Sequence, residues 1–115
     1  MLNKENRLTS RFEFNVTRKY GKYFEGTLSH IYILKPQNYT GVTKVGIVIS
    51  NKFHKSAAKR NRTRRIFREI IRANFDKLGE GMWVVVHPKF DCLGKTYEEI
   101  SSDFIKILQK ISIAN

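Results

Sequence analysis

The segment from residue 55 to residue 72, KSAAKRNRTRRIFREIIR, constrains the fold more than any other part of the chain. At the period of an α-helix, about 3.6 residues, its apolar side chains fall on one side. That apolar stripe consists of Thr63, Ile66, Phe67, Ile70 and Ile71. The opposite side consists of Asn61, Arg64, Arg65, Arg68 and Arg72. The pattern predicts a helix that docks on a sheet with one side and presents cations with the other.

Two apolar runs flank this helix and are typical of buried strands. Residues 44–50 (KVGIVIS) are rich in β-branched side chains, and residues 82–86 (MWVVV) end at His87 and Pro88. About 30 residues separate the two runs, which suits a β-α-β unit. We therefore expect an α/β (α+β) two-layer sandwich with a single sheet and three helices, forming one domain over residues 1–115.

The first helix is predicted between Ser10 and Gly21, because Ser10 and Glu13 form a capping box and glycine is typical of a helix end. Its apolar residues Phe12, Val16 and Tyr20 recur every four positions, which predicts the face that packs on the core. Phe14 lies off this stripe, one turn from Arg18.

Residues 27–34 alternate as a strand, with His30, Tyr32 and Leu34 on one face. Alternation alone leaves open which face is covered. A second capping box, Thr96 with Glu99, begins a final helix. The apolar stripe of that helix consists of Ile100, Phe104, Ile107, Leu108 and Ile111.

The basic charge predicts a polyanionic partner. The 55–72 segment holds eight cations, six of them arginine, against Glu69 alone, in a chain of net charge +12. Such crowding costs self-repulsion unless an anion neutralises it, and the planar guanidinium group matches phosphate geometry. A solvated face that only aids solubility is the alternative. We favour a nucleic-acid backbone.

Other classes of protein find little support. No apolar run approaches the roughly 20 residues needed to span a bilayer, and the first residues lack a secretory signal. Cys92 is the only cysteine, which is typical of a reducing compartment. We expect a cytoplasmic protein without a membrane partner. His30, His54 and His87 raise the alternative of a nuclease that uses paired imidazoles as acid and base, although such histidines are more often surface or strand-end residues. Together with Cys92, their spacing matches no zinc pattern.

The central segment closely resembles the bacterial ribonuclease P protein component. The resemblance rests on residues 45–52 (VGIVISNK), on residues 57–65 (AAKRNRTRR) with the Arg-Asn-Arg motif, and on Arg68-Glu69. It extends over nearly the whole chain. Further matches are Arg7-Leu8, Glu13-Phe14, Tyr32 and residues 83–86. Departures from the family pattern are Asn51, His54, Gly81 and His87.

This resemblance implies both a fold and a function. The fold would contain a left-handed β-α-β crossover, like that of ribosomal protein S5 domain 2, although the general rule favours right-handed crossovers. The function would be to assist the catalytic RNA subunit in the endonucleolytic removal of the 5′ leader from precursor tRNA. In that family Mg²⁺ acts in the complex of RNA and substrate. We therefore expect no catalytic residue and no metal site in the protein, which is expected to be monomeric.

The resemblance also implies two RNA-binding surfaces. The arginine-rich helix would contact the RNA subunit through Lys59, Arg60, Asn61, Arg62, Arg64, Arg65 and Arg68. A cleft between the first helix and the sheet would hold the single-stranded leader through Phe14, Arg18, Tyr32 and Lys52. The alternative is a structural ribosomal protein that binds rRNA. It would not distinguish precursor from mature tRNA, since only the precursor carries a leader.

Overall fold

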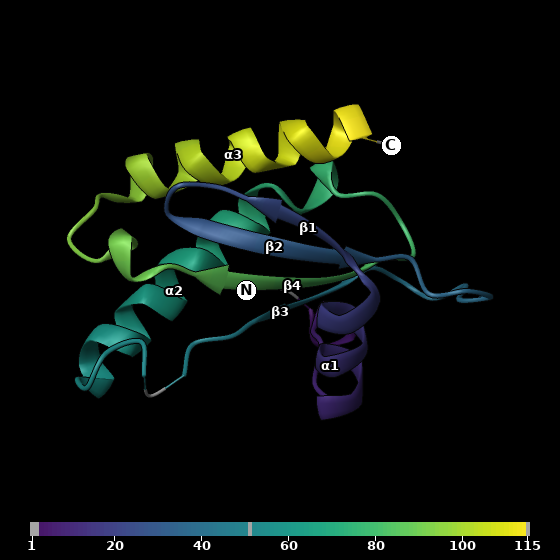
Figure 1. Cartoon of the computed structure of the whole chain (residues 1–115), viewed down its shortest axis with the longest axis horizontal. Coiled ribbons are helices and arrows are strands. Elements are labelled where there is room, and N and C mark those ends of the chain that lie inside the picture. Colours follow the sequence, from purple (N-terminus) through teal and green to yellow (C-terminus); the bar gives the residue numbers. More distant parts are fainter. Residues whose placement is uncertain (1–2, 51, 115) are drawn as a thin grey trace.

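The computed structural model describes residues 3–50 and 52–114, so the predicted departure at Asn51 lies outside the described residues. Its helices are α1 (Arg11–Tyr20), α2 (Ala57–Ala73) and α3 (Tyr97–Ala114), with short 3₁₀ turns at Lys4–Asn6, Phe75–Lys77 and Phe90–Cys92. Its strands are β1 (Lys22–Glu25), β2 (Ser29–Leu34), β3 (Lys44–Ile47) and β4 (Trp83–Pro88). The predicted α+β fold with one sheet and three helices is confirmed (Figure 1).

The four strands form one mixed sheet in the order β1-β2-β4-β3. β1, β2 and β4 pair antiparallel, whereas β3 pairs parallel to β4. The expected β-α-β unit therefore consists of β3, α2 and β4, while the handedness of its crossover stays a prediction. β1 was not predicted. It is a largely exposed edge strand of four residues, so it carries no apolar alternation that the sequence would show.

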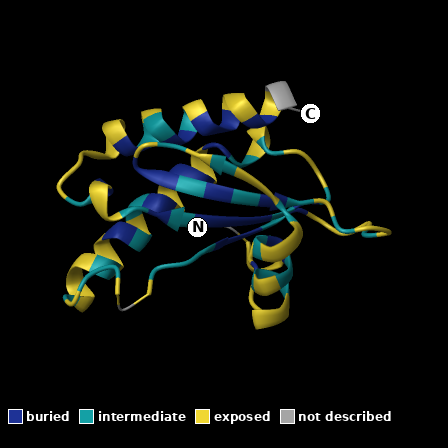
Figure 2. Ribbon diagram, in the orientation of Figure 1, coloured by how far each residue is buried: buried dark blue, intermediate teal, exposed yellow. Residues whose placement is uncertain are grey.

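The core lies between one face of the sheet and the helices α2 and α3. Ile31 pairs with Val86 across the sheet, and Ile33 pairs with Val84, so these side chains share the core face. The predicted stripes of both helices meet them: Phe67, Ile70 and Ile71 of α2 and Ile100, Phe104, Ile107, Leu108 and Ile111 of α3 are buried. Figure 2 shows α3 buried on its sheet side and exposed outward.

Helix α1 contacts β2 and β4, and lies across the sheet from α3 in Figure 1. The predicted core stripe on this helix is wrong, because Phe12 and Tyr20 are 68% and 66% exposed. The face that docks is offset from the aromatic stripe and centres on Thr17, which is fully buried. Phe14 lies on this docked face, half-buried. The docked face of α1 therefore combines Thr17 with the Phe14 ring, which lies over Gly46, and it differs from the apolar stripe that the sequence predicts.

Both predicted capping boxes are present. Glu13 N donates to Ser10 Oγ at 3.1 Å, and Glu99 N donates to Thr96 Oγ1 at 3.1 Å. The Glu13 carboxylate has a second role, since Lys44 Nζ of β3 lies 3.2 Å from it. This ion pair joins α1 to the edge of the sheet. Within the described ranges, no helix combines the length and apolar character that a membrane crossing requires.

Candidate nucleic-acid interface

Apart from Arg72, the cations on the outer face of α2 form no ion pair with a carboxylate of the described residues. Lys59, Arg62, Arg65 and Arg68 are exposed, and Arg64 is half-buried. The ion pairs found among residues 3–50 and 52–114 join Lys44 to Glu13, Arg72 to Glu69 and Lys89 to Glu25. Of these, only the Arg72–Glu69 pair lies on α2. The predicted cations are therefore available to an external polyanion.

Arg60 and Asn61 differ from the other predicted residues of this helix. Arg60 Nη1 donates to the carbonyl oxygens of His54 and Lys55, at 2.6 and 3.0 Å. Asn61 Oδ1 accepts from Arg64 Nη1 at 3.1 Å, so these two side chains are joined within one turn of the helix. Arg60 thus fixes the loop that leads into α2. His54 helps in the same loop, since its Nδ1 accepts from Ser56 N at 2.9 Å.

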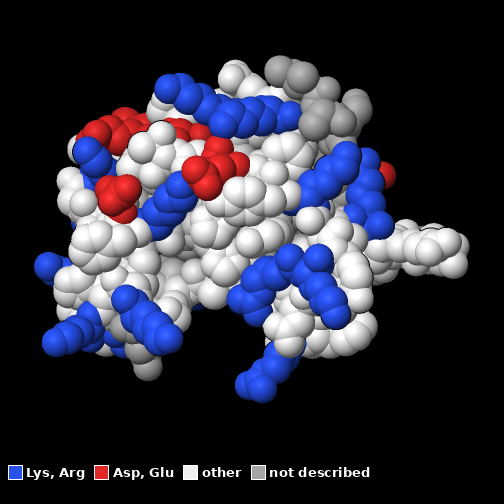
Figure 3. Space-filling view, in the orientation of Figure 1, with Lys and Arg blue, Asp and Glu red and all other residues white. Residues whose placement is uncertain are grey.

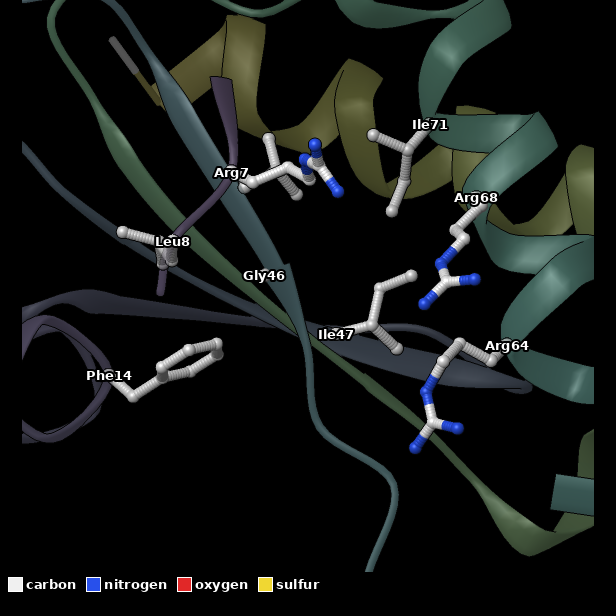
Figure 4. Close-up of a pocket in the computed structure, with 9 residues that line it drawn as sticks. Arg7, Leu8, Phe14, Gly46, Ile47, Arg64, Arg68 and Ile71 are labelled. Carbon is white, nitrogen blue, oxygen red and sulfur yellow. The ribbon is translucent and has the colours of Figure 1, made fainter. Parts of the chain in front are cut away.

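A cavity of about 180 Å³ lies where the N-terminal segment, α1, β3 and α2 meet (Figure 4). Its apolar lining consists of Leu8, Phe14, Val45, Gly46, Ile47 and Ile71. The guanidinium groups of Arg7, Arg64 and Arg68 reach toward it from two sides. Position 46 must be glycine for this arrangement, because a β-carbon there would overlap the Phe14 ring. The cavity therefore joins Phe14, a predicted leader residue, to the arginine helix.

A cluster of aromatic rings occupies the sheet face opposite the core. His30 and His87 pair across β2 and β4, and their rings stack at a centroid distance of 4.7 Å. Tyr32 contacts both imidazoles edge-on, at 5.8 and 5.6 Å, and lies 5.2 Å from Tyr23 of β1. Tyr32 is thus half-buried on the sheet face opposite the core, rather than part of the core.

The four predicted leader residues do not share one cavity. Tyr32 and Gly46 both pair with Val85, so the Phe14 ring above Gly46 and the Tyr32 ring lie on the same sheet face, two strands or roughly 10 Å apart. Lys52 lines a separate hollow that also includes His87. Arg18 donates to Asn15 at 2.8 Å and lies near enough to His87 to act on its charge.

Neither of the two RNA-binding surfaces predicted from the sequence included Arg7, Tyr23, His30 or His87. The shared face of His30 and Tyr32 was visible in the alternation of β2. The meeting of His30 with His87, and of Tyr23 with Tyr32, depends on the strand register. Arg7 reaches the cavity because it bridges to Val45 at the edge of β3. No local sequence pattern indicates either arrangement.

The burial of His87 makes the stability of the fold depend on pH in the acidic range. Burial, together with the charges of His30 and Arg18, lowers the pKa of His87 from its ordinary 6.5 to about 4. Between these values the unfolded chain binds more protons than the folded one, so stability falls as the pH drops from about 6.5 toward 4. We expect His87→Phe to reduce this loss, measured as the free energy of urea unfolding at pH 7 and pH 5. An equal loss in both proteins would contradict the prediction.

Charge is unevenly distributed over the surface. In Figure 3 the acidic side chains gather around the start of α3, whereas Lys and Arg cover the projecting ends of α1 and α2, with a hollow between them. Asp91, Glu98, Glu99 and Asp103 line the acidic region. This polarity orients a polyanion toward the α1–α2 side. Among the described residues, no group of three or more His, Cys, Asp or Glu side chains could hold a metal ion.

Together, the fold and this surface define a small α+β protein with a strongly basic outer face on α2. Residues 2–112 match the family model of ribonuclease P, and the chain belongs to the ribonuclease P protein family. Its members are accessory subunits of an endoribonuclease that processes tRNA, so the ribonuclease P RNA is the partner of this chain. The ribosomal-protein alternative receives no support.

Curated relatives and solved structures agree with this assignment. The chain is 34% identical to the ribonuclease P protein component of a Pseudanabaena species, covering 98% of this chain and 97% of the relative. It is 32% identical to that of Finegoldia magna, covering 96% and 95%. The ribonuclease P protein structure from Thermotoga maritima superposes with a TM-score of 0.77 at 25% identity, covering 90% of this chain and 96% of that one.

Proposed function

We propose that residues 1–115 form a single RNA-binding domain that binds the ribonuclease P RNA with the outer face of α2. The contacting residues would be Lys59, Asn61, Arg62, Arg64, Arg65 and Arg68, with Arg60 fixing the approach loop. The observation that carries this proposal is that these cations are paired with no carboxylate of the described chain. Carboxylates of the described chain therefore do not neutralise these cations, which can pair with phosphates instead.

The sheet face and the cavity beside it are proposed to hold the 5′ leader of precursor tRNA. An unpaired strand is held by stacking of its bases on aromatic rings and by neutralisation of its backbone, and stacking is worth about 1–3 kcal/mol per base. Phe14 and Tyr32 would provide the rings, and Arg18 and Lys52 the charge. Such contacts tolerate many leader sequences.

Hydrolysis itself is assigned to the RNA subunit, with Mg²⁺ bound by the complex of RNA and substrate. The α2 surface would repel a free cation because arginines crowd it. We assign no catalytic residue to the protein, and we propose a monomer that acts in the cytoplasm.

Reconstitution with a bacterial ribonuclease P RNA at low Mg²⁺ tests the proposed function. Added protein is expected to raise the rate of precursor cleavage and to strengthen binding of precursor over mature tRNA. The protein alone is expected to cleave nothing. Unchanged cleavage in the presence of the protein would refute the accessory role, and equal gains for both tRNAs would refute leader binding.

Phe14→Ala is expected to weaken precursor binding by about 5- to 150-fold, the loss of one stacked base, with mature tRNA binding unchanged. Phe12→Ala is the matched control, since Phe12 lies two residues away on α1 and is 68% exposed. Binding of both tRNAs by the reconstituted holoenzyme is the measurement. Equal losses for precursor and mature tRNA would show that Phe14 acts only in packing.

A further inference from the structure

Two imidazoles stack on the sheet face opposite the core, and each has a buried ring nitrogen without a hydrogen bond. The rings of His30 and His87 lie 4.7 Å apart between centroids and 11° from parallel. His30 Nδ1 and His87 Nε2 have no partner among residues 3–50 and 52–114. A neutral imidazole can leave such an atom unprotonated, whereas an imidazolium must place an N–H there at the cost of an unmade hydrogen bond. The protein alone therefore favours the neutral form of both rings.

The surroundings of His30 add little net charge. Burial lowers the pKa of His30, Lys89 lowers it further, and Glu25 raises it. Lys89 Nζ and Glu25 Oε2 lie 3.5 Å apart, so their effects partly cancel. The ring centroids of Tyr23 and Tyr32 lie 5.1 and 5.8 Å from that of the imidazole. Tyr23 stays uncharged near neutral pH, because its hydrogen bond to Glu25 raises its pKa to about 12.

The surroundings of His87 are cationic. Burial is the main cause that lowers the pKa of His87 to about 4, and the charges of His30 and Arg18 act in the same direction. Lys52 lines the hollow that includes His87, and no Asp or Glu is among the described residues that line it. Tyr32 contacts the ring edge-on, at 5.6 Å between centroids. A proton on His87 is thus opposed both by burial and by the cations beside it.

A phosphate bound on this face would reverse that balance. Arg18 and Lys52 are the cations proposed above to neutralise the backbone of the leader. A phosphate beside them offsets their charge, so the field that opposes an imidazolium weakens, and phosphate oxygens accept hydrogen bonds from charged N–H groups. Because two charges on rings 4.7 Å apart repel each other, the pair takes up one proton rather than two.

We infer that the His30–His87 pair takes up one proton when an RNA phosphate lies on this sheet face, so that RNA binding strengthens as the pH falls. The proton comes from the solvent and forms one N–H bond on an imidazole, and no other covalent bond changes. The inference rests on the proposed leader binding and deepens it. It adds His30 and His87 to the groups that determine the affinity, and it makes that affinity depend on pH.

The direction of the effect follows from proton linkage. The complex binds more protons than the protein alone, so acid favours the complex. Because the pKa of His87 in the protein alone is about 4, the gain in affinity continues as the pH falls toward that value. The stability of the protein alone changes in the opposite direction over the same range, which separates the two effects.

Titration of the full chain with a short oligouridylate, at constant salt and at about pH 7.5 and about pH 6, tests this inference. Uracil takes up no proton in this range, so the RNA itself contributes no pH dependence. We expect binding to be at least about threefold tighter at the lower pH. Equal affinity at the two pH values would overturn the inference.

Matched variants assign the proton to the pair. The double variant His30→Phe with His87→Phe keeps two stacked rings but removes their titratable nitrogens, and it is expected to lose the gain in acid. His54→Asn is the control, because it removes the remaining histidine of the chain while asparagine keeps an acceptor for Ser56 N. The control is expected to keep the gain. A gain that persists in the double variant, or that disappears in the control, would overturn the inference.

The unchanged protein provides a second measurement that needs no variant to fold. The imidazole proton signals of His30 and His87 are followed by NMR against pH, with and without the oligouridylate. We expect the RNA to raise the titration midpoint of the pair by at least about half a pH unit. An unchanged or lowered midpoint would overturn the inference.

These results are distinguishable from a failure of the proposed function. If the holoenzyme prefers precursor over mature tRNA but oligouridylate binding does not change with pH, proton uptake is refuted and leader binding stands. Conversely, if precursor and mature tRNA bind equally while the oligouridylate still raises the midpoint of the pair, the leader assignment fails and the proton-linked site stands.

Discussion

Replacing Arg62, Arg65 and Arg68 together by glutamine is expected to weaken binding of the ribonuclease P RNA on the order of 10²-fold at physiological salt. The three guanidinium groups are exposed and make no ion pair with the described protein, so each is available to neutralise a phosphate. Each lost phosphate contact removes roughly 0.7–0.9 from the slope of log affinity against log salt. Filter binding over a salt series should therefore show a slope flatter by about two to three.

The control for this variant removes the same charge elsewhere. Lys77, Lys95 and Lys106 are exposed and lie outside α2, and two of them line the acidic region near α3. Their joint replacement by glutamine is expected to change the affinity and the salt slope little. If both triple variants lose affinity equally, net charge rather than the α2 face governs RNA binding.

Phe67→Ala is expected to lower the free energy of unfolding, whereas the arginine variant is expected to lower RNA affinity. Phe67 is fully buried on the inner side of α2, against the sheet and α3. Removing such a ring costs about 3–5 kcal/mol, a large share of the roughly 5–15 kcal/mol that stabilises a typical domain. Urea denaturation followed by circular dichroism measures the loss. A change below about 1 kcal/mol would mean that α2 does not dock through this ring.

The two variants together test the two sides of one helix. The arginine variant is expected to keep the unfolding free energy within about 0.5 kcal/mol for each exposed substitution. Conversely, Phe67→Ala keeps all its cations. At a low temperature where part of it remains folded, that folded part is expected to bind RNA with the same salt dependence as the unchanged protein. Loss of both properties in both variants would contradict the separation of docking and binding.

Much of the fold was predictable because it depends on local patterns. Two helices bury the residues that the helical period predicts, and both capping boxes form. Helix α1 is the exception. Its aromatic stripe of Phe12 and Tyr20 is exposed, because this helix rests on the sheet through Thr17 and its neighbours instead of through a broad apolar face. The helical period of apolar residues therefore predicts the buried face of a helix only when the helix packs on the core through that apolar face.

By itself, the sequence determined the family, the sheet with three helices and the cationic outer face of α2, since each depends on residues close together along the chain. Only the tertiary structure decided which of these residues meet. Strand register stacked His30 on His87, and a bridge at the edge of β3 brought Arg7 to Arg64 and Arg68. Such contacts join residues far apart in the sequence, and their geometry follows from how the whole core packs rather than from any local period.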